Sequence, residues 1–489
     1  MTGQGDAHSS EAGPAERPAA AGRAPWTARL ALAAALALSL VRLGAFVRVF
    51  ARRSLQMDFS AFYTAGEALN HGLSPYVNNF RFGIWDGVDS LVHSRFLYPP
   101  LVAALFQPLA AAPYSAAKVI WMLFALAALG VALGMAARAA GAGRGIEPLL
   151  GLFLAAALFY PLLTLLERGQ IDTVTLLLVT AAAAWMTRDR LPRPAGRGDW
   201  RSYLAGAFLA LACLLKLNIG FAAPFLLLRR QWRALAGLVG GALVLGAASL
   251  VVVGPAMVAD YVHRELPRIE RYGEGGPGGL PASDFRSLLA GVPRGETRQG
   301  ARVYPDAYFG FVANGTLVRA LQPRFPHTGQ SRLSLELFAA FAAVMLVAEA
   351  VLRLRGAPPR GPDEFAYWNA VFCIVLLAGP LTWVMNVVWL LPAAAVVIGQ
   401  ARRGAGPVQA AALAVCTAGL IWAALPDSQS FSMLLPSTIH WRILADPWRY
   451  PVAELAVFVG LLGVVLAAPR NRPASARTAG EAGGAEAGR

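Results

Sequence analysis

One aspartate near the first apolar segment has the surroundings that acid–base chemistry at a membrane surface needs. Helical spacing places Asp58, Phe62, Ala65 and Leu69 on one face, so the only acid on that face stands at its start. A carboxylate held on an apolar support can act as a general base toward a hydroxyl group. The same residue can instead cap a helix that we expect to end near Gly72. The spacing leaves both roles open.

Three basic residues stand where an anionic ligand would meet the membrane. Lys216 separates two apolar runs and precedes Asn218, and a cation at membrane depth is costly without a partner. We therefore expect Lys216 to contact a phosphate, although a lysine that snorkels to the interface fits the same pattern. Arg52 and Arg53 precede the Asp58 segment, where they can bind an anionic lipid head group or simply meet bulk phospholipid.

A further polar group lies at the junction between two apolar runs. It comprises Glu167, Arg168, Gln170 and Asp172. Polar side chains grouped beside an apolar wall commonly orient the hydroxyl groups of a ligand. Asp172 can equally cap the helix that we expect to follow it. The junction is thus a candidate binding site with a purely structural alternative.

The sequence carries no pattern typical of a metal or nucleotide site. The six histidines are scattered without close ligand spacing, and no D-x-D pair occurs in the predicted outer loops. Glycine patterns of the Walker or Rossmann type are also missing. We therefore expect neither a metal nor another cofactor.

The composition indicates a protein of the lipid bilayer. Of the 489 residues, 56% are hydrophobic and only 15% are charged, which excludes a disordered chain and an ordinary soluble protein. The net charge of +15 comes from arginines that interrupt the apolar runs. Because they form no basic face with stacking aromatic residues, we expect no nucleic-acid partner.

The spacing of the apolar runs predicts an all-α polytopic membrane protein with about twelve transmembrane helices. The runs are 28–50, 117–137, 149–166, 171–187, 202–216, 217–229, 233–253, 331–353, 365–383, 387–400, 407–425 and 450–468. An N-terminus on the cytoplasmic side places the short arginine-rich connections inside, as the positive-inside rule requires. This orientation also requires that residues 98–115, which four prolines interrupt, do not cross the membrane.

The same topology divides the chain into three parts. Residues 1–27 and 469–489 are expected to be disordered and cytoplasmic, because they are rich in small and polar residues. Residues 28–468 form the membrane domain. Its outer loops, at 51–116, 254–330 and 426–449, are expected to carry short helices and the active site.

The first of these loops carries a recognisable motif. It comprises Asp58-Phe59, Tyr63, Ala65-Gly66, Ala68, Gly72 and Pro75-Tyr76. This motif resembles the first-loop signature of glycosyltransferase family 87, membrane enzymes of the GT-C class that are similar to bacterial polyprenyl-phosphate-mannose-dependent mannosyltransferases. Later landmarks follow in the same order, so the resemblance spans about residues 30 to 400. They are Tyr98-Pro99-Pro100-Leu101, Gly169-Gln170, Lys216, Asn314-Gly315-Thr316-Leu317 and Pro380-Leu381-Thr382-Trp383.

The resemblance implies a GT-C-type fold and a sugar transfer without a metal or other cofactor. A hexose, with mannose as the first choice, would pass from a polyprenyl phosphate sugar donor to a lipid-linked glycolipid or cell-envelope glycan acceptor. Asp58 would be the general base of an inverting reaction on the outer face of the cell membrane. The residues expected to bind substrate are Arg52, Arg53, Tyr63, Tyr98, Glu167, Gln170, Lys216, Asn218, Asn314, Trp383 and Asn386.

One departure from the family pattern leaves the sugar open. Many members carry a histidine pair shortly after the tryptophan that matches Trp383, whereas this chain has Val384-Met385-Asn386. Asn386 can replace the hydrogen bonds of a histidine but not its charge. A pentosyl (arabinosyl) transferase of the same class therefore stays an alternative.

A twelve-span transporter or lipid flippase is the alternative from another class of protein. The number of apolar runs permits it. Against it, the ionisable residues gather at one membrane face, whereas the coupling sites of transporters usually lie near the midplane.

Overall fold

The computed structural model describes most of the membrane domain. The described residues are 26–52, 56–76, 96–143, 145–188, 200–271, 316–325, 327–356, 358–425 and 448–468. Within these ranges the regular secondary structure is entirely helical, which confirms the predicted all-α class. Arg53, Asn314, residues 1–25 and 469–489 of the two predicted disordered ends, and parts of all three predicted outer loops lie outside the described residues; residues 26 and 27 belong to the first helix.

The helices follow the apolar runs of the sequence in order. The α-helices are α1 (Trp26–Arg52), α2 (Met57–Asn70), α3 (Pro100–Ala110), α4 (Tyr114–Ala139), α5 (Ile146–Leu158), α6 (Tyr160–Arg168), α7 (Asp172–Arg188), α8 (Trp200–Leu215), α9 (Ala223–Leu228), α10 (Trp232–Val252), α11 (Pro255–Asp260), α12 (Leu266–Arg271), α15 (Leu317–Leu321), α16 (Gln330–Leu354), α17 (Pro362–Ala378), α18 (Leu391–Arg403), α19 (Pro407–Ala424) and α20 (Arg449–Leu466). The 3-10 helices are η2 (Leu217–Ala222), η5 (Gln322–Arg324) and η6 (Val384–Leu390), and η3 (Tyr261–Glu265) is a π-helix.

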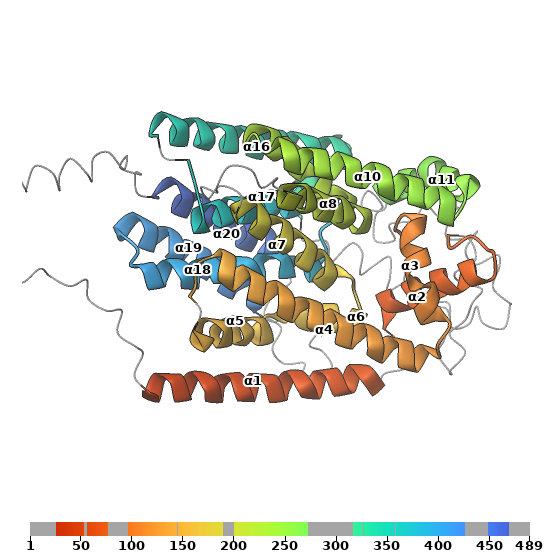
Figure 1. The fold of residues 1–489 in the computed structure, drawn as a ribbon, viewed down its shortest axis with the longest axis horizontal. Helices are drawn as coiled ribbons and strands as arrows, with labels where there is room; N and C mark the ends of the chain where they lie inside the picture. Colours follow the sequence, from red (N-terminus) through yellow and green to blue (C-terminus); the bar gives the residue numbers. More distant parts are fainter. Residues whose placement is uncertain are drawn as a thin grey trace, which may run out of the picture.

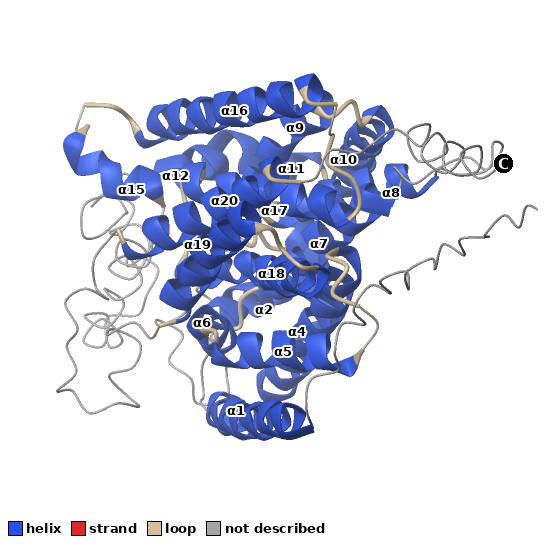
Figure 2. Ribbon diagram, turned by 90° about the vertical axis from the view of Figure 1, so that its left-hand side faces the viewer, coloured by secondary structure: helices blue, strands red, loops and turns tan. Residues whose placement is uncertain are grey.

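The long helices run side by side as one bundle (Figure 1). Helix α1 lies along one edge and α16 along the opposite edge, and the view turned by 90° shows the same order (Figure 2). Helix α17 lies between them and is buried at every residue from Glu364 to Ala378. The short helices α2, α3 and α11 gather at one end of the bundle, to the right in Figure 1.

Length and composition support a multi-pass membrane protein. Seven helices in the described part of the chain can cross a membrane, and α5 with α6 makes an eighth segment that is bent by 64°. The other four predicted spans correspond to α7, α8, α17 and η2 with α9, which are shorter. For these four, and so for the count of twelve, crossing stays a prediction.

Residues 98–115 form a short helix and the start of the next long one. Helix α3 has 11 residues with Pro108 inside it, which corresponds to about 16 Å at 1.5 Å per residue. A hydrocarbon layer is roughly 30 Å thick. Helix α3 is therefore too short to cross by itself, as the sequence-based topology requires.

Glycines allow α8 and α10 to pack in backbone contact. A Cβ atom at Gly206 would lie 1.9 Å from the carbonyl oxygen of Ala234, and one at Gly237 would lie 2.0 Å from that of Tyr203. Small residues at such positions are how membrane helices approach closely. The contact holds α8 in place, and Lys216 directly follows the end of α8.

Candidate active site

Helix α2 is held in place by an aromatic cluster. Phe59 stacks on Trp121 at a centroid distance of 6.1 Å, and Phe62 stacks on Phe106 at 4.7 Å. Phe59 and Phe62 are fully buried, and every residue from Asp58 to Gly66 is buried, so this part of α2 is enclosed all round and not along the predicted face alone. The helix is followed by Gly72 at a φ of +69°, close to the predicted end.

Gly169 joins the start of α2 to the end of α6. Its φ of +72° ends α6 in the left-handed conformation, and an added Cβ would lie 2.6 Å from the Cβ of Phe59. The side chain of Gln56 donates to the carbonyl oxygen of Leu166 at 2.7 Å, and the indole of Trp121 donates to that of Gly169 at 2.8 Å. These contacts bring the last residue of α6 beside the first turn of α2.

Asp58 and Arg168 form a bidentate ion pair at this junction. Arg168 Nε lies 2.7 Å from Asp58 Oδ2, and Arg168 Nη2 lies 3.0 Å from Asp58 Oδ1. The Asp58 residue is only 5% exposed. Gln56 occupies the N-cap position of α2, and Asp58 lies in the first turn of the helix. Bidentate contact fixes both the position and the orientation of the carboxylate.

A second polar group links three segments that are distant in the sequence. Lys216 Nζ lies 3.5 Å from Asp172 Oδ2, and Asn386 Nδ2 donates to Asp172 Oδ1 at 2.5 Å. Asn386 Oδ1 also accepts from the backbone N–H of Trp383 at 2.6 Å. The Lys216 ammonium lies 5.7 Å from the ring centroid of Tyr98. Its side chain is 14% exposed and points inward, unlike a snorkelling lysine.

Both groups border one cavity of about 160 Å³. Its polar lining residues are Asp58, Tyr98, Arg168, Gln170, Lys216, Asn218, Tyr261 and Trp383, and its apolar wall includes Phe62, Leu215, Leu217, Ile269, Pro380 and Leu381. An anion, a hydroxyl-rich group and an apolar chain can all find complementary surfaces here.

Tyr98 stands between the two polar groups. Its phenol donates to Gln170 Oε1 at 3.1 Å. Burial raises the pKa of Tyr98 to about 12, although the nearby Lys216 ammonium acts in the opposite direction. The phenol therefore keeps its proton at neutral pH and can serve as a hydrogen-bond donor.

The cavity collects six of the predicted site residues: Asp58, Tyr98, Gln170, Lys216, Asn218 and Trp383. Four others do not line it. Arg52 ends α1, Glu167 is half-buried on α6, and Tyr63 donates to the carbonyl oxygen of Ala112 at 2.8 Å. Asn386 acts from behind the cavity, through Asp172 and the Trp383 backbone.

Arg168 and Asp172 belong to this site although the predicted list of binding residues omits them. The available signal was their charge at the junction of two apolar runs, which pointed to the group but not to the role of each member. Among the described residues, no group of three or more His, Cys, Asp or Glu side chains could hold a metal ion. Metal-free chemistry stays a prediction.

A helical bundle with a polar cavity at one end is typical of a multi-pass membrane protein that acts on a ligand at the membrane surface. Glycosyltransferase family 87 matches residues 96–380, more than half of the chain. The chain belongs to this family, so the predicted family is confirmed and the protein is a membrane glycosyltransferase. The match begins after Asp58 and ends before Asn386, so the roles of these two residues are not established by it.

The crystal structure of ArnT from Cupriavidus metallidurans in the apo state is similar over 88% of this chain and 76% of that chain, with 15% sequence identity and a TM-score of 0.35. A likeness this distant carries no conclusion about activity. No curated protein matches the chain significantly in sequence.

Proposed function

We propose that the protein transfers a hexose, with mannose as the first choice, from a polyprenyl phosphate sugar to a lipid-linked or cell-envelope glycan. The observation that carries the proposal is the shared cavity: a carboxylate, Asp58, and a cation, Lys216, line the same small space. Transfer of an activated sugar needs both, because a hydroxyl proton must leave and a phosphate must be released.

The proposed reaction is a single displacement. The oxygen of an acceptor hydroxyl forms a bond to the anomeric carbon of the sugar, and its proton passes to the Asp58 carboxylate. The bond between that carbon and the phosphate oxygen breaks, and its electron pair leaves with the polyprenyl phosphate. Attack opposite the leaving group inverts the anomeric centre, so a β-linked donor gives an α-linked product.

Two cations are available to the departing phosphate. Lys216 is held at 3.5 Å from Asp172, a distance that leaves room for a closer partner. Arg168 binds both oxygens of Asp58 and also lines the cavity, so its guanidinium can meet a phosphate while keeping the carboxylate in position. We assign the phosphate contact to Lys216 and the orientation of the base to Arg168.

The apolar wall suits the lipid part of the donor. Leu215, Leu217 and Leu381 line the cavity beside Lys216. A polyprenyl chain can lie against such residues while its phosphate stays at the cation. On the acceptor side, Tyr98 and Gln170 offer hydrogen bonds to sugar hydroxyls, and Trp383 offers a flat apolar surface.

The proposal includes the orientation of the bundle. Lys216 follows the end of α8, and Arg229, Arg230 and Arg233 lie near the start of α10, at the opposite end of the bundle. Short arginine-rich connections stay cytoplasmic. The cavity then faces the outer side of the cell membrane, both termini are cytoplasmic, and the bilayer supplies both the donor and the acceptor.

The decisive experiment measures transfer of labelled sugar from synthetic polyprenyl-phosphate-mannose to membrane glycolipids by the purified protein and by Asp58→Asn. The wild type should transfer sugar, and the variant should be about 10²–10⁴-fold slower, the usual contribution of a general base. Thermal unfolding of both proteins shows whether the variant is folded. Equal transfer rates for the wild type and Asp58→Asn would mean that Asp58 is not the general base.

A pentose donor is the second arm of the same experiment. Asn386 stands in place of the histidine that the family resemblance implies near Trp383, and it reaches the cavity only through Asp172 and the Trp383 backbone. If the protein transfers sugar from a polyprenyl-phosphate pentose and none from the mannose donor, its donor sugar is a pentose and not a hexose. Movement of intact lipid-linked sugar across vesicles without release of polyprenyl phosphate would instead indicate a transporter or flippase.

A further inference from the structure

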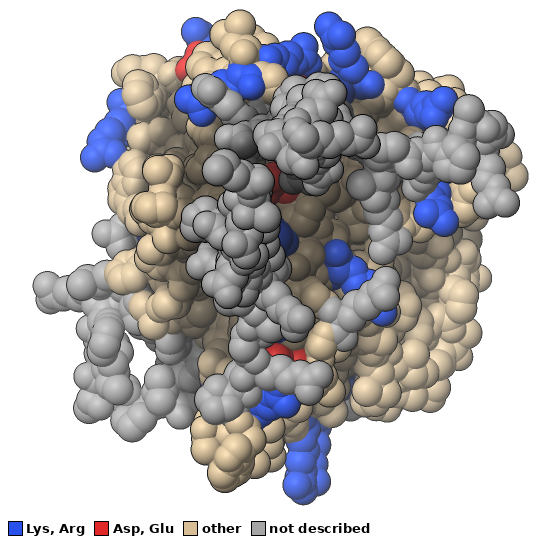
Figure 3. All heavy atoms as spheres, turned by 60° about the vertical axis from the view of Figure 1, so that its left-hand side comes forward, with Lys and Arg blue, Asp and Glu red and all other residues tan. Residues whose placement is uncertain are grey.

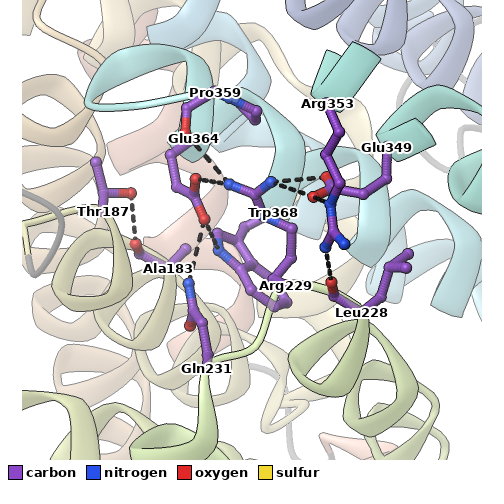
Figure 4. Close-up of polar contacts among 10 residues, drawn as sticks. All are labelled: Ala183, Thr187, Leu228, Arg229, Gln231, Glu349, Arg353, Pro359, Glu364 and Trp368. Atoms are coloured by element: carbon purple, nitrogen blue, oxygen red, sulfur yellow. Dashed lines mark hydrogen bonds and ion pairs between the residues drawn. The ribbon is translucent and has the colours of Figure 1, made fainter. Parts of the chain in front are cut away.

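The end of the bundle opposite the cavity contains a buried charge network centred on Arg229. Figure 4 shows its guanidinium between Glu349 and Glu364, on two different helices. Arg229 Nη1 lies 2.9 and 2.6 Å from the two oxygens of Glu349, and Nη2 donates to Glu364 and to the carbonyl oxygen of Pro359.

Neighbouring side chains donate further hydrogen bonds to the carboxylates of the two glutamates. Arg353 donates to Glu349 at 2.9 Å and to the carbonyl oxygen of Leu228 at 2.6 Å. Glu364 accepts from Gln231 at 3.1 Å and from the indole of Trp368 at 3.2 Å. Both acidic charges are therefore engaged within the network, which ties the turn before α10 to the end of α16 and the start of α17.

A hollow of about 800 Å³ borders this network. Its charged lining consists of five arginines and one glutamate: Arg229, Arg230, Arg233, Arg353, Arg360 and Glu349. Arg230, Arg233 and Arg360 are exposed at its rim. Seen with this end turned forward, Lys and Arg side chains gather along the upper edge, where α16 and α10 lie in Figure 1 (Figure 3).

The positive-inside rule accounts for arginines in each connection but not for their convergence. Residues 229–233 and 353–360 are more than a hundred positions apart, yet both groups line one hollow. The hollow also meets the apolar surface of the bundle: Trp232 lines it, and Leu354, which follows Arg353, is exposed. A ligand that fits both features has an anionic head and an apolar tail.

We propose that this hollow binds the phosphate of an anionic phospholipid head group, at the end of the bundle opposite the Asp58 cavity. Arg230, Arg233 and Arg360 supply the charge that attracts the phosphate, and Trp232 and Leu354 face the acyl chains. The inference does not depend on the proposed sugar transfer. Free phosphate has the same charge chemistry but no acyl chain, so the two sources can be separated by experiment.

The test measures ligands retained by the purified full-length protein in neutral detergent, by native mass spectrometry. Short-chain phosphatidylglycerol, phosphatidylcholine and inorganic phosphate are offered separately. The wild type should retain phosphatidylglycerol about tenfold more strongly than phosphatidylcholine, the order of effect that juxtamembrane arginines have on anionic lipids. Inorganic phosphate alone should not be retained.

Three variants make the test specific. The triple change Arg230→Gln, Arg233→Gln and Arg360→Gln should abolish the preference, and the corresponding triple lysine variant should keep most of it, which excludes misfolding as the cause. Arg402→Gln is the matched control, because Arg402 lies at the same end, pairs with Glu147 and does not line the hollow. Its preference should be unchanged.

Two outcomes would overturn the proposal. An equal loss in the triple glutamine variant and in Arg402→Gln would mean diffuse attraction to the whole face. Retention of inorganic phosphate as strong as that of phosphatidylglycerol would assign the hollow to a free anion instead of a lipid.

Discussion

The two ends of the bundle both contain a buried arginine–carboxylate pair, but the pairs differ in what surrounds them. The Arg229 side chain is 1% exposed and is enclosed by two glutamates and a backbone carbonyl. The Arg168 side chain is 13% exposed, and its partner Asp58 lines an open cavity. A cation shared by two carboxylates on different helices can hold those helices together, whereas a cation paired with one carboxylate beside a cavity can also meet a ligand.

The Arg229 network and the Asp58–Arg168 pair differ in solvation as well as in their contacts. Two charges taken out of water lose their hydration, and good geometry only partly compensates for this loss. At Arg229 two glutamates and a backbone carbonyl oxygen already neutralise and bond the guanidinium, although the hollow opens beside it. At Asp58 the cavity leaves one side of the pair open, so a bound substrate can replace water there.

The largest effect on stability is expected from Arg229→Met. This change leaves Glu349 and Glu364 buried without their shared cation, which should destabilise the protein by about 3–5 kcal/mol. Thermal unfolding in detergent measures the loss. Arg332→Met is the control, because its pair with Glu336 is exposed and should contribute less than about 1 kcal/mol. Equal shifts would mean that the enclosed network is not a structural anchor.

Lys216→Met should act mainly on the donor. Loss of a charge-assisted contact to the phosphate is expected to raise the KM for the polyprenyl phosphate donor about tenfold to a hundredfold. Initial rates at varied donor concentration measure it, and Lys216→Arg should retain part of the binding.

Lys118→Met is the matched control for Lys216. Lys118 is also buried, close to the ring of Tyr114, but it does not line the cavity. Its donor KM should stay near the wild-type value. A rise as large as that of Lys216→Met would show that removal of any buried lysine disturbs the site.

Gly169→Ala tests how tightly the base is positioned. A non-glycine residue in the left-handed region costs about 1–2 kcal/mol, and the new methyl would also meet Phe59 at 2.6 Å. Gly72→Ala has a similar φ but no atom within 4 Å of the added carbon, so it isolates the backbone term. Transfer rates should fall in Gly169→Ala and not in Gly72→Ala. A lower transfer rate in Gly72→Ala with an unchanged rate in Gly169→Ala would show that the junction at Gly169 does not position the base.

The smallest effect is expected at Arg230, which has a φ of 54° although it is not glycine. Arg230→Gly should relieve this strain and stabilise the protein by about 1 kcal/mol in neutral detergent, measured by thermal unfolding. Phosphatidylglycerol should stabilise the variant less than the wild type. A loss of stability in neutral detergent would mean that the arginine side chain is needed for folding rather than for a ligand.

The sequence predicts local features well and long-range pairing poorly. Apolar periodicity located the long helices, because helix formation depends on neighbouring residues. The pairs Asp58–Arg168 and Asp172–Asn386 join residues 110 and 214 positions apart. No local pattern specifies which charged residues pair. The sequence therefore identified Arg168 and Asp172 as members of a polar group but did not predict their partners.

The run 149–166 shows the same limit. It was predicted as one span, but it bends by 64° between α5 and α6. Pro161 lies in the first turn of α6, where its missing N–H and fixed φ favour the start of a new helix. The bend turns Arg168 toward α2, and hydropathy alone does not reveal it.

Helix α17 makes the two ends of the molecule depend on one another through helical register. Glu364 in its first turn belongs to the Arg229 network, and the segment that follows its last residue leads to Trp383 at the cavity. One inserted residue rotates everything beyond it by about 100°. An alanine inserted near the middle of α17 would leave Glu364 in its network but shift Trp383, whose ring centroid lies 5.8 Å from the Arg168 guanidinium carbon. The length of this helix is therefore more constrained than its composition, because an inserted residue changes the register of everything that follows it.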